Sequence, residues 1–157
     1  MELVCLVNIL EHFGIKMKLF LDCEFTNFQG DLISMALVAE NGDEFYEVVQ
    51  YDPARCHPWV IENVLPVLNK DFIFYEDFQL NLKKFLNKYD EIEVIADWPE
   101  DFYHFTAALL TGPGNMMTVP KLSMHLELRL NYLSTNPHNA LNDAQAIKAG
   151  YLKKYTP

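Results

Sequence analysis

The sequence predicts an α/β domain whose mixed sheet has five strands, three antiparallel strands followed by two parallel ones, with helices flanking the sheet. Between residues 18 and 51, apolar runs are separated by turn residues, which is typical of consecutive antiparallel strands. From residue 75 onward, helical periodicity alternates with short apolar runs, which is typical of parallel strands joined by crossover helices. A length of 157 residues suits one such domain with a single core.

The composition is that of a folded chain kept in a reducing compartment. Half of the residues are hydrophobic and 13% are aromatic, which excludes a disordered protein. The cysteines Cys5, Cys23 and Cys56 are odd in number and lack C-x-x-C spacing, which argues against a disulfide framework or a zinc site. We therefore expect a cytoplasmic protein.

Residues 1–16 precede the first predicted strand and have two interpretations. The apolar run 3–10 is too short to span a membrane, and it lacks the basic segment and cleavage site of a signal peptide. The segment is either a short helix packed on the domain or an extension upstream of the native start, since Met17 directly precedes the strand. We accordingly divide the chain into an N-terminal extension, 1–16, and a single domain, 17–157.

The stretch 18–28, KLFLDCEFTNF, begins as a buried strand and then places Asp22 and Glu24 two residues apart. Side chains alternate along a strand, so these two carboxylates share one face, whereas Leu21, Cys23 and Phe25 point the other way. Buried carboxylates are costly without a positive partner, and a divalent cation is the first candidate. The alternative is an ordinary strand end whose acids are in water.

The next two strands are predicted to form a hairpin. The apolar run 32–39 is followed by Glu40-Asn41-Gly42-Asp43 and then by the return strand 44–51. Asn-Gly between two apolar runs favours a type I′ turn, because both central residues of that turn need positive φ angles. This hairpin would place the acidic strand near the centre of the sheet.

Two helices precede the fourth strand. Pro58 suits the first turn of a short helix over 59–65, which Pro66 interrupts. The stretch 75–89 carries one apolar stripe and predicts a longer helix packed on the core. The stripe consists of Phe78, Leu82, Phe85, Leu86 and Tyr89.

The fourth strand, 91–96, delivers Asp97 at its C-terminal end, where α/β sheets place their ligand sites. Pro99 then opens a helix that we expect to end at Gly112-Pro113-Gly114. Asp97 has a second interpretation as the N-cap of this helix. Glu100 and Asp101 are interpreted as acids that favour the helix N-terminus electrostatically.

The segment 121–132 is ambiguous, and the final helix follows it. Strict alternation of apolar residues favours a strand, whereas leucine and methionine favour a helix. We prefer the strand, because a fifth strand after a crossover helix completes the sheet. The final helix carries Ala140, Ala144, Ile147 and Tyr151 on one face.

Three motifs in this order, D-x-E at 22–24, a lone Asp97 and H-x-x-x-x-D at 138–143, resemble the DEDDh group of DnaQ-like 3'-5' exonucleases. HNALNDAQA is similar to the third motif of that group. The resemblance runs from about residue 17 to the C-terminus. DCEF, ADWPEDF and TGPG look like the small bacterial and phage exoribonuclease branch. The resemblance implies an RNase H-like fold and a 3'-5' exonuclease.

The resemblance also implies a metal site and the roles of its residues. The ligands of two ions, Mg²⁺ or Mn²⁺, would be Asp22, Glu24, Asp97 and Asp143. Asp22 would contact both ions, and His138 would take the proton from the attacking water.

The spacing of His138 and Asp143 predicts where each of them lies. Five residues of a helix turn through about 500°, so the two side chains cannot both point inward from one regular helix. We expect His138 in the loop before the helix and Asp143 within the helix. Asn136, Pro137 and Asn139 are suitable residues for such a helix start.

Substrate contacts follow from the same resemblance. Phe25 and Thr26 lie where the family holds the terminal nucleotide, and Trp98 either stacks on a base or packs in the core. His57, His104 and His125 are interpreted as structural or solvent-facing. A net charge of −10 argues against tight binding of long duplexes, which need a basic surface, but not against a grip on one or two terminal nucleotides.

We expect single-stranded or 3'-overhanging nucleic acid as the partner, with RNA or short oligonucleotides favoured, and no membrane. A homodimer is implied by the resemblance. The alternatives are a DNA 3'-5' exonuclease of the same fold and a catalytically silent nucleic-acid-binding domain.

Overall fold

Six strands form the main sheet in the order β4-β3-β2-β1-β5-β8 in the computed structural model, which describes residues 15–157. The strands are β1 (Lys16–Phe25), β2 (Leu32–Ala39), β3 (Glu44–Val49), β4 (Phe72–Ile73), β5 (Glu91–Ala96) and β8 (Lys121–Leu126). Neighbours among β1, β2 and β3 are antiparallel, whereas β5 runs parallel to β1 and β8 runs parallel to β5. The predicted mixed sheet is confirmed, and the two-residue β4 extends it beyond β3.

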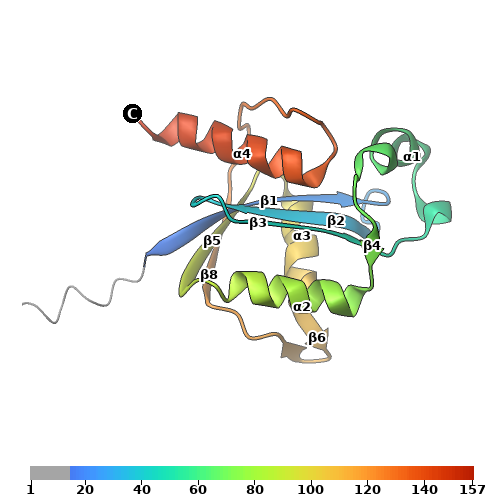
Figure 1. Ribbon diagram of the computed structural model, residues 1–157, viewed down its shortest axis with the longest axis horizontal. Coiled ribbons are helices and arrows are strands. Elements are labelled where there is room, and N and C mark those ends of the chain that lie inside the picture. The colour runs from blue at the N-terminus through green and yellow to red at the C-terminus, as the bar shows by residue number, and fades with distance from the viewer. Residues whose placement is uncertain (1–14) are drawn as a thin grey trace, which may run out of the picture.

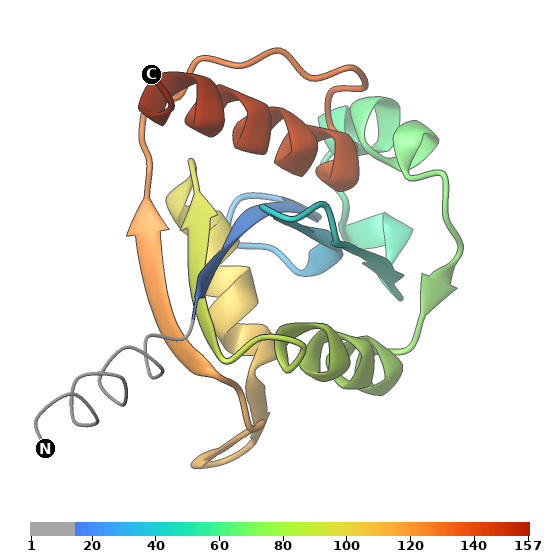
Figure 2. The same ribbon diagram turned by 60° about the vertical axis from the view of Figure 1, so that its left-hand side comes forward.

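Helices cover both faces of this sheet, as Figures 1 and 2 show. The helix α4 (Ala140–Tyr155) lies on one face, and α2 (Tyr75–Leu86) and α3 (Pro99–Ala108) lie on the other. Side chains of alternate residues of β1 point to opposite faces of the sheet. Phe20 packs against Ile147 of α4, whereas Leu21 belongs to the large cluster shared with α2 and α3. Because β1 has strands on both sides and helices on both faces, its end is a rigid support for functional groups.

The hairpin between β2 and β3 forms as expected, but its turn is not type I′. The amide of Gly42 donates to the carbonyl of Ala39 at 3.0 Å, and the amide of Ala39 donates to the carbonyl of Asp43 at 2.8 Å. Gly42 has a φ of +99°, whereas Asn41 keeps a negative φ. A type I turn followed by a left-handed glycine therefore connects the strands, and only the glycine needs the positive φ.

The helix α3 is shorter than predicted. It ends at Ala108, and Gly112-Pro113-Gly114 lies instead in a hairpin of β6 (Leu110–Gly112) and β7 (Asn115–Met116). Gly114 has a φ of +69°, so the glycine serves the turn of the hairpin and not the end of the helix. The amide of Met117 donates to the carbonyl of Leu109, which fixes this hairpin below α3.

The strand preferred for 121–132 is confirmed, but β8 ends at Leu126. The amide of Glu127 donates to the carbonyl of Ala96, which is the last residue of β5. Beyond that point no strand within residues 15–157 lies beside the chain, and residues 127–139 continue as an irregular segment over α4 (Figure 2).

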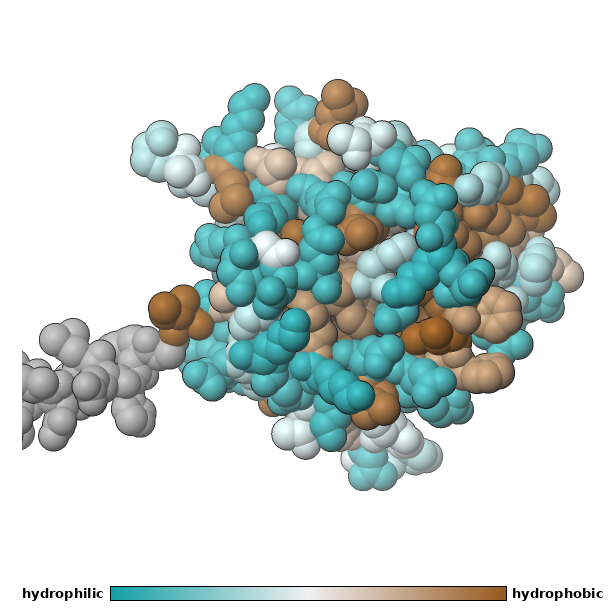
Figure 3. All heavy atoms as spheres, viewed as in Figure 1, coloured by the Kyte–Doolittle hydropathy of each residue, from teal (hydrophilic) through white to brown (hydrophobic). Residues whose placement is uncertain are grey.

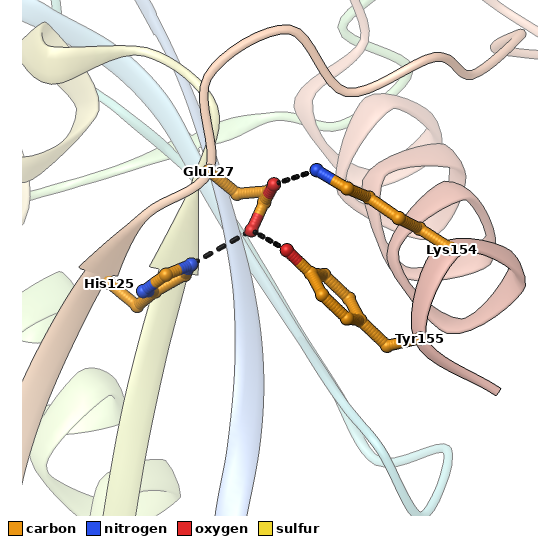
Figure 4. A network of polar contacts seen from close by, with 4 residues as sticks. All are labelled: His125, Glu127, Lys154 and Tyr155. Carbon is orange, nitrogen blue, oxygen red and sulfur yellow. Dashed lines mark hydrogen bonds and ion pairs between the residues drawn. The ribbon is translucent and has the colours of Figure 1, made fainter.

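A polar network joins the start of this irregular segment to the end of α4 (Figure 4). The buried carboxylate of Glu127 accepts hydrogen bonds from Lys154 Nζ at 2.5 Å and from the Tyr155 hydroxyl at 2.9 Å. Its second oxygen also lies 2.8 Å from Nε2 of His125. These contacts hold the C-terminal turn of α4 against the edge of the sheet.

The short helix α1 (Pro58–Asn63) lies beyond the end of β3, between 3-10 turns at Pro53–Arg55 and Leu65–Val67. Nδ1 of His57 accepts from the amide of Trp59 and so caps α1. Hydrophobic side chains gather on the side of the molecule where α1 lies (Figure 3). Within residues 15–157, no helix is long and apolar enough to cross a membrane. The extension predicted at 1–16 falls almost entirely on residues 1–14, outside the described residues.

Candidate metal centre and active site

Acidic side chains from four elements meet at the C-terminal end of β1 and β5. Because these two strands are parallel, their C-terminal ends share one edge of the sheet, and residues that follow them lie side by side. β1 supplies Asp22 and Glu24, the residue after β5 is Asp97, α3 supplies Asp101 in its first turn, and α4 supplies Asp143. We call these five residues together with His138 the acidic centre.

The acidic centre consists of two groups of possible ligand atoms among the described residues. Atoms of Asp22, Asp97 and Asp101 all lie within 4.8 Å of one another, and so do atoms of Glu24, His138 and Asp143. The two groups are neighbours, because Asp22 and Glu24 share one face of β1. The structure thus brings together all five residues that the motifs indicate, and it adds Asp101.

Several oxygens of the acidic centre are buried without a hydrogen-bond partner in the described part of the chain. They are Oδ2 of Asp22, Oδ2 of Asp101 and Oδ1 of Asp143. An unpartnered buried carboxylate oxygen is costly, and hard oxygen ligands are the ones that Mg²⁺ and Mn²⁺ prefer. The residues present therefore fit a divalent metal site.

Burial and mutual repulsion raise the pKa values of these acids. Burial, and then the charge of Asp101, raise the pKa of Asp22 well above its ordinary value. Burial, and then the charge of Asp143, raise the pKa of Glu24 to about 9. The pKa of Asp101 is also raised, first by burial and then by the charge of Asp97. A cation would remove this penalty, because it favours the ionised form of every carboxylate beside it.

Asp101 was missed by the sequence interpretation, which assigned it to helix electrostatics. Its side chain is 2% exposed, and Oδ1 accepts a hydrogen bond from the amide of Cys23 at 3.2 Å. The spacing of Asp97 and Asp101 could have indicated this position. The first turn of a helix that follows a β-strand stays above the end of that strand, so an acid there can reach the same point as the acid after the strand.

Asp97 does not cap α3. The N-cap residue is Trp98, and its side chain makes no capping hydrogen bond. Instead, Oδ2 of Asp97 accepts a hydrogen bond from the hydroxyl of Tyr132 at 2.8 Å.

Tyr132 comes from the segment 127–139, which passes close to α4 at Gly150. A Cβ on that glycine would lie only 2.9 Å from the carbonyl oxygen of Asn131 and 3.1 Å from Cβ of Tyr132.

His138 lies in the loop before α4, as the motif spacing predicts, and Asp143 lies within the helix. The backbone of His138 has a φ of +69°, and its amide donates to Oδ2 of Asp143 at 2.9 Å. Asn139 caps the helix by accepting from the amide of Asn142 at 3.1 Å. The ring of His138 meets the ring of Trp59 edge-on, with 4.8 Å between centroids. These contacts fix the imidazole next to Glu24 and Asp143.

The residues predicted to bind substrate have three different environments. Phe25 is half-buried and stacks on His104, with 5.0 Å between ring centroids. Thr26 is buried, and its hydroxyl accepts from the amide of Asp31 at 2.9 Å, so its side chain shapes the loop after β1. Trp98 is 58% exposed, which excludes the alternative that it packs in the core.

No protein-family model matches the chain. The chain is 32% identical over 148 residues to the 3'-5' exoribonuclease Rv2179c of Mycobacterium tuberculosis strain H37Rv, with 82% of this chain and 88% of the relative covered. The 3'-5' exoribonuclease MT2234.1 of strain CDC 1551 matches with the same identity and coverage. The chain belongs to the family of these exoribonucleases, the DEDDh-type nucleases of the DnaQ-like superfamily.

Proposed function

We propose that the protein is a metal-dependent exoribonuclease that hydrolyses phosphodiester bonds from the 3' end of RNA or short oligonucleotides. The observation that carries this proposal is the acidic centre, where three buried carboxylate oxygens have no hydrogen-bond partner among the described residues and where His138 lies beside Glu24 and Asp143. The names of the mycobacterial relatives, both 3'-5' exoribonucleases, support the reaction and the polarity.

Two divalent cations, Mg²⁺ or Mn²⁺, would be held by Asp22, Glu24, Asp97 and Asp143, with Asp101 as a further ligand. When bound, such a pair supplies an activated water and charge stabilisation for the pentavalent phosphorus and the leaving alkoxide. The chain contributes rigid placement of its carboxylates. Asp22 and Glu24 are fixed by the central strand, and Asp101 is fixed by its hydrogen bond from Cys23.

His138 is proposed as the general base that accepts a proton from the attacking water. Its position supports this role, because the imidazole comes from a loop and lies within 4.8 Å of acceptor atoms of Glu24 and Asp143. The hydrogen bond from the His138 amide to Asp143 limits how far the imidazole ring can move away from the acidic centre. Phe25, Thr26 and Trp98 are proposed to hold the terminal nucleotides of the substrate.

The partner is proposed to be single-stranded or 3'-overhanging RNA. Homodimer formation and a cytoplasmic location stay predictions. Within the described residues, Cys23 and Cys56 are both free thiols, which is compatible with a reducing compartment.

The test is cleavage of a 5'-labelled oligonucleotide, as RNA and as DNA, with Mg²⁺ or Mn²⁺. We expect RNA to shorten from its 3' end, and we expect chelator or Asp22→Asn to stop the reaction. Asp71→Asn is the matched control, because Asp71 is exposed and is not part of the acidic centre. Shortening of DNA alone would favour the DNA exonuclease, and binding without cleavage would favour the silent domain.

A further inference from the structure

The side chain of Asn139 makes two separate sets of hydrogen bonds. It is buried, with 3% of its surface exposed. Its Oδ1 accepts from the amide of Asn142 at 3.1 Å, which is the cap of α4. Its Nδ2 donates to the carbonyl of Val67 at 2.8 Å and to the carbonyl of Leu68 at 3.4 Å. Capping requires the oxygen alone, so the amide nitrogen joins the start of α4 to a second part of the chain.

The carbonyl groups that receive Nδ2 are themselves fixed. Val67 ends the 3-10 turn that follows α1, and Leu68 comes directly after it. The hydroxyl of Tyr46, on β3, donates to the carbonyl of Leu68 at 2.7 Å and lies 3.4 Å from Nδ2 of Asn139. Lys70 Nζ donates to the carbonyl of Tyr46 at 2.6 Å. We call the amide of Asn139, the carbonyls of Val67 and Leu68 and the hydroxyl of Tyr46 the Asn139 anchor.

The segment that holds Asn139 also contacts the ring of His138. Figure 1 shows the start of α4 beside the part of the chain that carries α1. Val60, Val64 and Leu68 belong to one hydrophobic cluster, so α1 and the 3-10 turn after it pack as one unit. This unit contacts the imidazole of His138 through Trp59 and the next residue of the chain through the Asn139 anchor. Two neighbouring contacts therefore determine where the imidazole lies.

The backbone of His138 needs such support. Its φ of +69° is in the left-handed region, which a residue with a side chain adopts only where its surroundings impose it. On one side, the amide of His138 donates to Oδ2 of Asp143 at 2.9 Å. On the other side, the Asn139 anchor fixes the residue that follows. When the anchor is lost, we expect the backbone to relax toward a negative φ and the imidazole to move.

The helix α4 does not depend on the Asn139 anchor for its place on the sheet. Ala140 and Ala144 pack against β2, and Ile147 packs against β1 and β5. This packing keeps Asp143 at the acidic centre when the contacts of Asn139 with Val67 and Leu68 are removed. Loss of the anchor should therefore displace the imidazole of His138 and leave the carboxylates in place.

We propose that Asn139 is a positioning residue that acts through His138: its side-chain amide, held by Val67, Leu68 and Tyr46, keeps the imidazole at the point from which it accepts a proton. This inference rests on the proposed function. It gives the side chain two tasks, a helix cap through its oxygen and the alignment of the general base through its nitrogen. It also makes Tyr46 a second positioning residue, through the carbonyl that it shares with Asn139.

The first test separates these two tasks by Asn139→Ser. Serine still caps the helix, because its hydroxyl can accept from the amide of Asn142, but it has no amide group to reach Val67. We expect kcat to fall roughly 10- to 100-fold, since a misplaced catalytic group costs about that much. KM and the Mg²⁺ concentration for half-maximal activity should change less than about twofold. Tyr46→Phe, which removes one hydroxyl, should lower kcat by roughly two- to tenfold.

The double variant shows whether Asn139 acts through His138. In His138→Ala, measured in single turnovers with enzyme in excess, adding Asn139→Ser should lower the rate less than about twofold. Asn87→Ser is the matched control, because Asn87 also ends a helix and donates from Nδ2 to two carbonyls, those of Lys83 and Thr118, outside the acidic centre. It should keep the wild-type kcat.

An equal fold-loss from Asn139→Ser with and without His138 would overturn the inference and leave the proposed function intact. So would a wild-type kcat in Asn139→Ser. Absence of cleavage by the wild type would overturn the proposed function, and with it the role of Asn139 in proton transfer.

A further measurement tests the placement of the imidazole without any cleavage. The chain has two tryptophans, so Trp98→Phe leaves Trp59, which contacts His138, as the only one. In this variant, Asn139→Ser should change the fluorescence of Trp59 in the same direction as His138→Ala does, and Asn87→Ser should not. An unchanged Trp59 spectrum in Asn139→Ser would contradict the inference.

Discussion

The hydroxyl of Tyr132 donates a hydrogen bond to Oδ2 of Asp97 across 2.8 Å. This contact joins the irregular segment after β8 to the acid that follows β5. Burial raises the pKa of Asp97, and the hydrogen bond from Tyr132 opposes this rise. Tyr132 therefore favours the ionised carboxylate, which is the form that a cation needs.

Tyr132→Phe should weaken metal binding without unfolding the protein. The change removes only the hydroxyl, so the ring keeps its packing beside Phe20 and Ile147. Loss of an outer hydrogen bond to a metal ligand typically costs about 10- to 100-fold in metal affinity or activity. We expect half-saturation of activity at roughly tenfold higher Mg²⁺, with kcat at saturating Mg²⁺ changed little. A metal titration of activity measures this, and Tyr155→Phe, which removes a hydroxyl bound to Glu127, is the control.

Asp101→Asn should abolish activity nearly as fully as Asp22→Asn. The amide oxygen of asparagine can still accept from the amide of Cys23, so the fold should persist, but a charged ligand is lost. We expect at least about a 100-fold loss of kcat. Asp77→Asn is the matched control, since Asp77 is an exposed acid in the first turn of α2. If Asp101→Asn loses as little activity as the control Asp77→Asn, Asp101 serves the helix N-terminus, as the sequence first suggested.

Without cations, the protein should become less stable as the pH rises. The folded-state pKa of Glu24 is about 9, whereas an unfolded glutamate titrates at about 4.3. Between these values the folded state binds more protons than the unfolded state, so the free energy of unfolding falls with pH and levels off above about 9. Thermal unfolding in chelator from about pH 5 to 9 should show this fall, Glu24→Gln should reduce it, and Mg²⁺ should oppose it. An equal slope in the wild type and in Glu24→Gln would contradict the prediction.

The network around Glu127 should stabilise the protein at neutral pH and not in strong acid (Figure 4). Hydrogen bonds, first from Lys154 and then from His125, lower the pKa of Glu127 to about 2. Because the folded-state pKa is below the unfolded value of about 4.3, the stabilisation is present above pH 4.3 and is lost as the pH falls through about 2.

Glu127→Gln should therefore lower the midpoint of thermal unfolding by about 2–4 °C at pH 7 and by less near pH 3. Glu62→Gln is a suitable control, because Glu62 is exposed and makes no ion pair among the described residues. An equal loss at both pH values would show that shape, and not charge, is what Glu127 contributes.

The sequence predicted those features that depend on periodicity or on long-range motif order. Alternation along β1 correctly placed Asp22 and Glu24 on one face, and helical geometry correctly separated His138 from Asp143. Features that depend on which segments of the chain pair or pack against each other could not be predicted in this way. The end of β8 depends on where β5 ends, and the turn at Gly42 depends on the twist of two paired strands. Asp101 was not predicted as part of the acidic centre, because an acid in the first turn of a helix already has an ordinary electrostatic explanation.

The close approach of the polypeptide at Gly150 makes the last helix sensitive to a single methyl group. Gly150 lies seven residues beyond Asp143, about 10 Å farther along the helix, and it touches no acid of the centre. Alanine at this position would collide with Asn131 and Tyr132 and would push the tyrosine hydroxyl off Asp97. A remote, chemically inert substitution should thus impair cation binding while the helix itself, which prefers alanine, gains intrinsic stability.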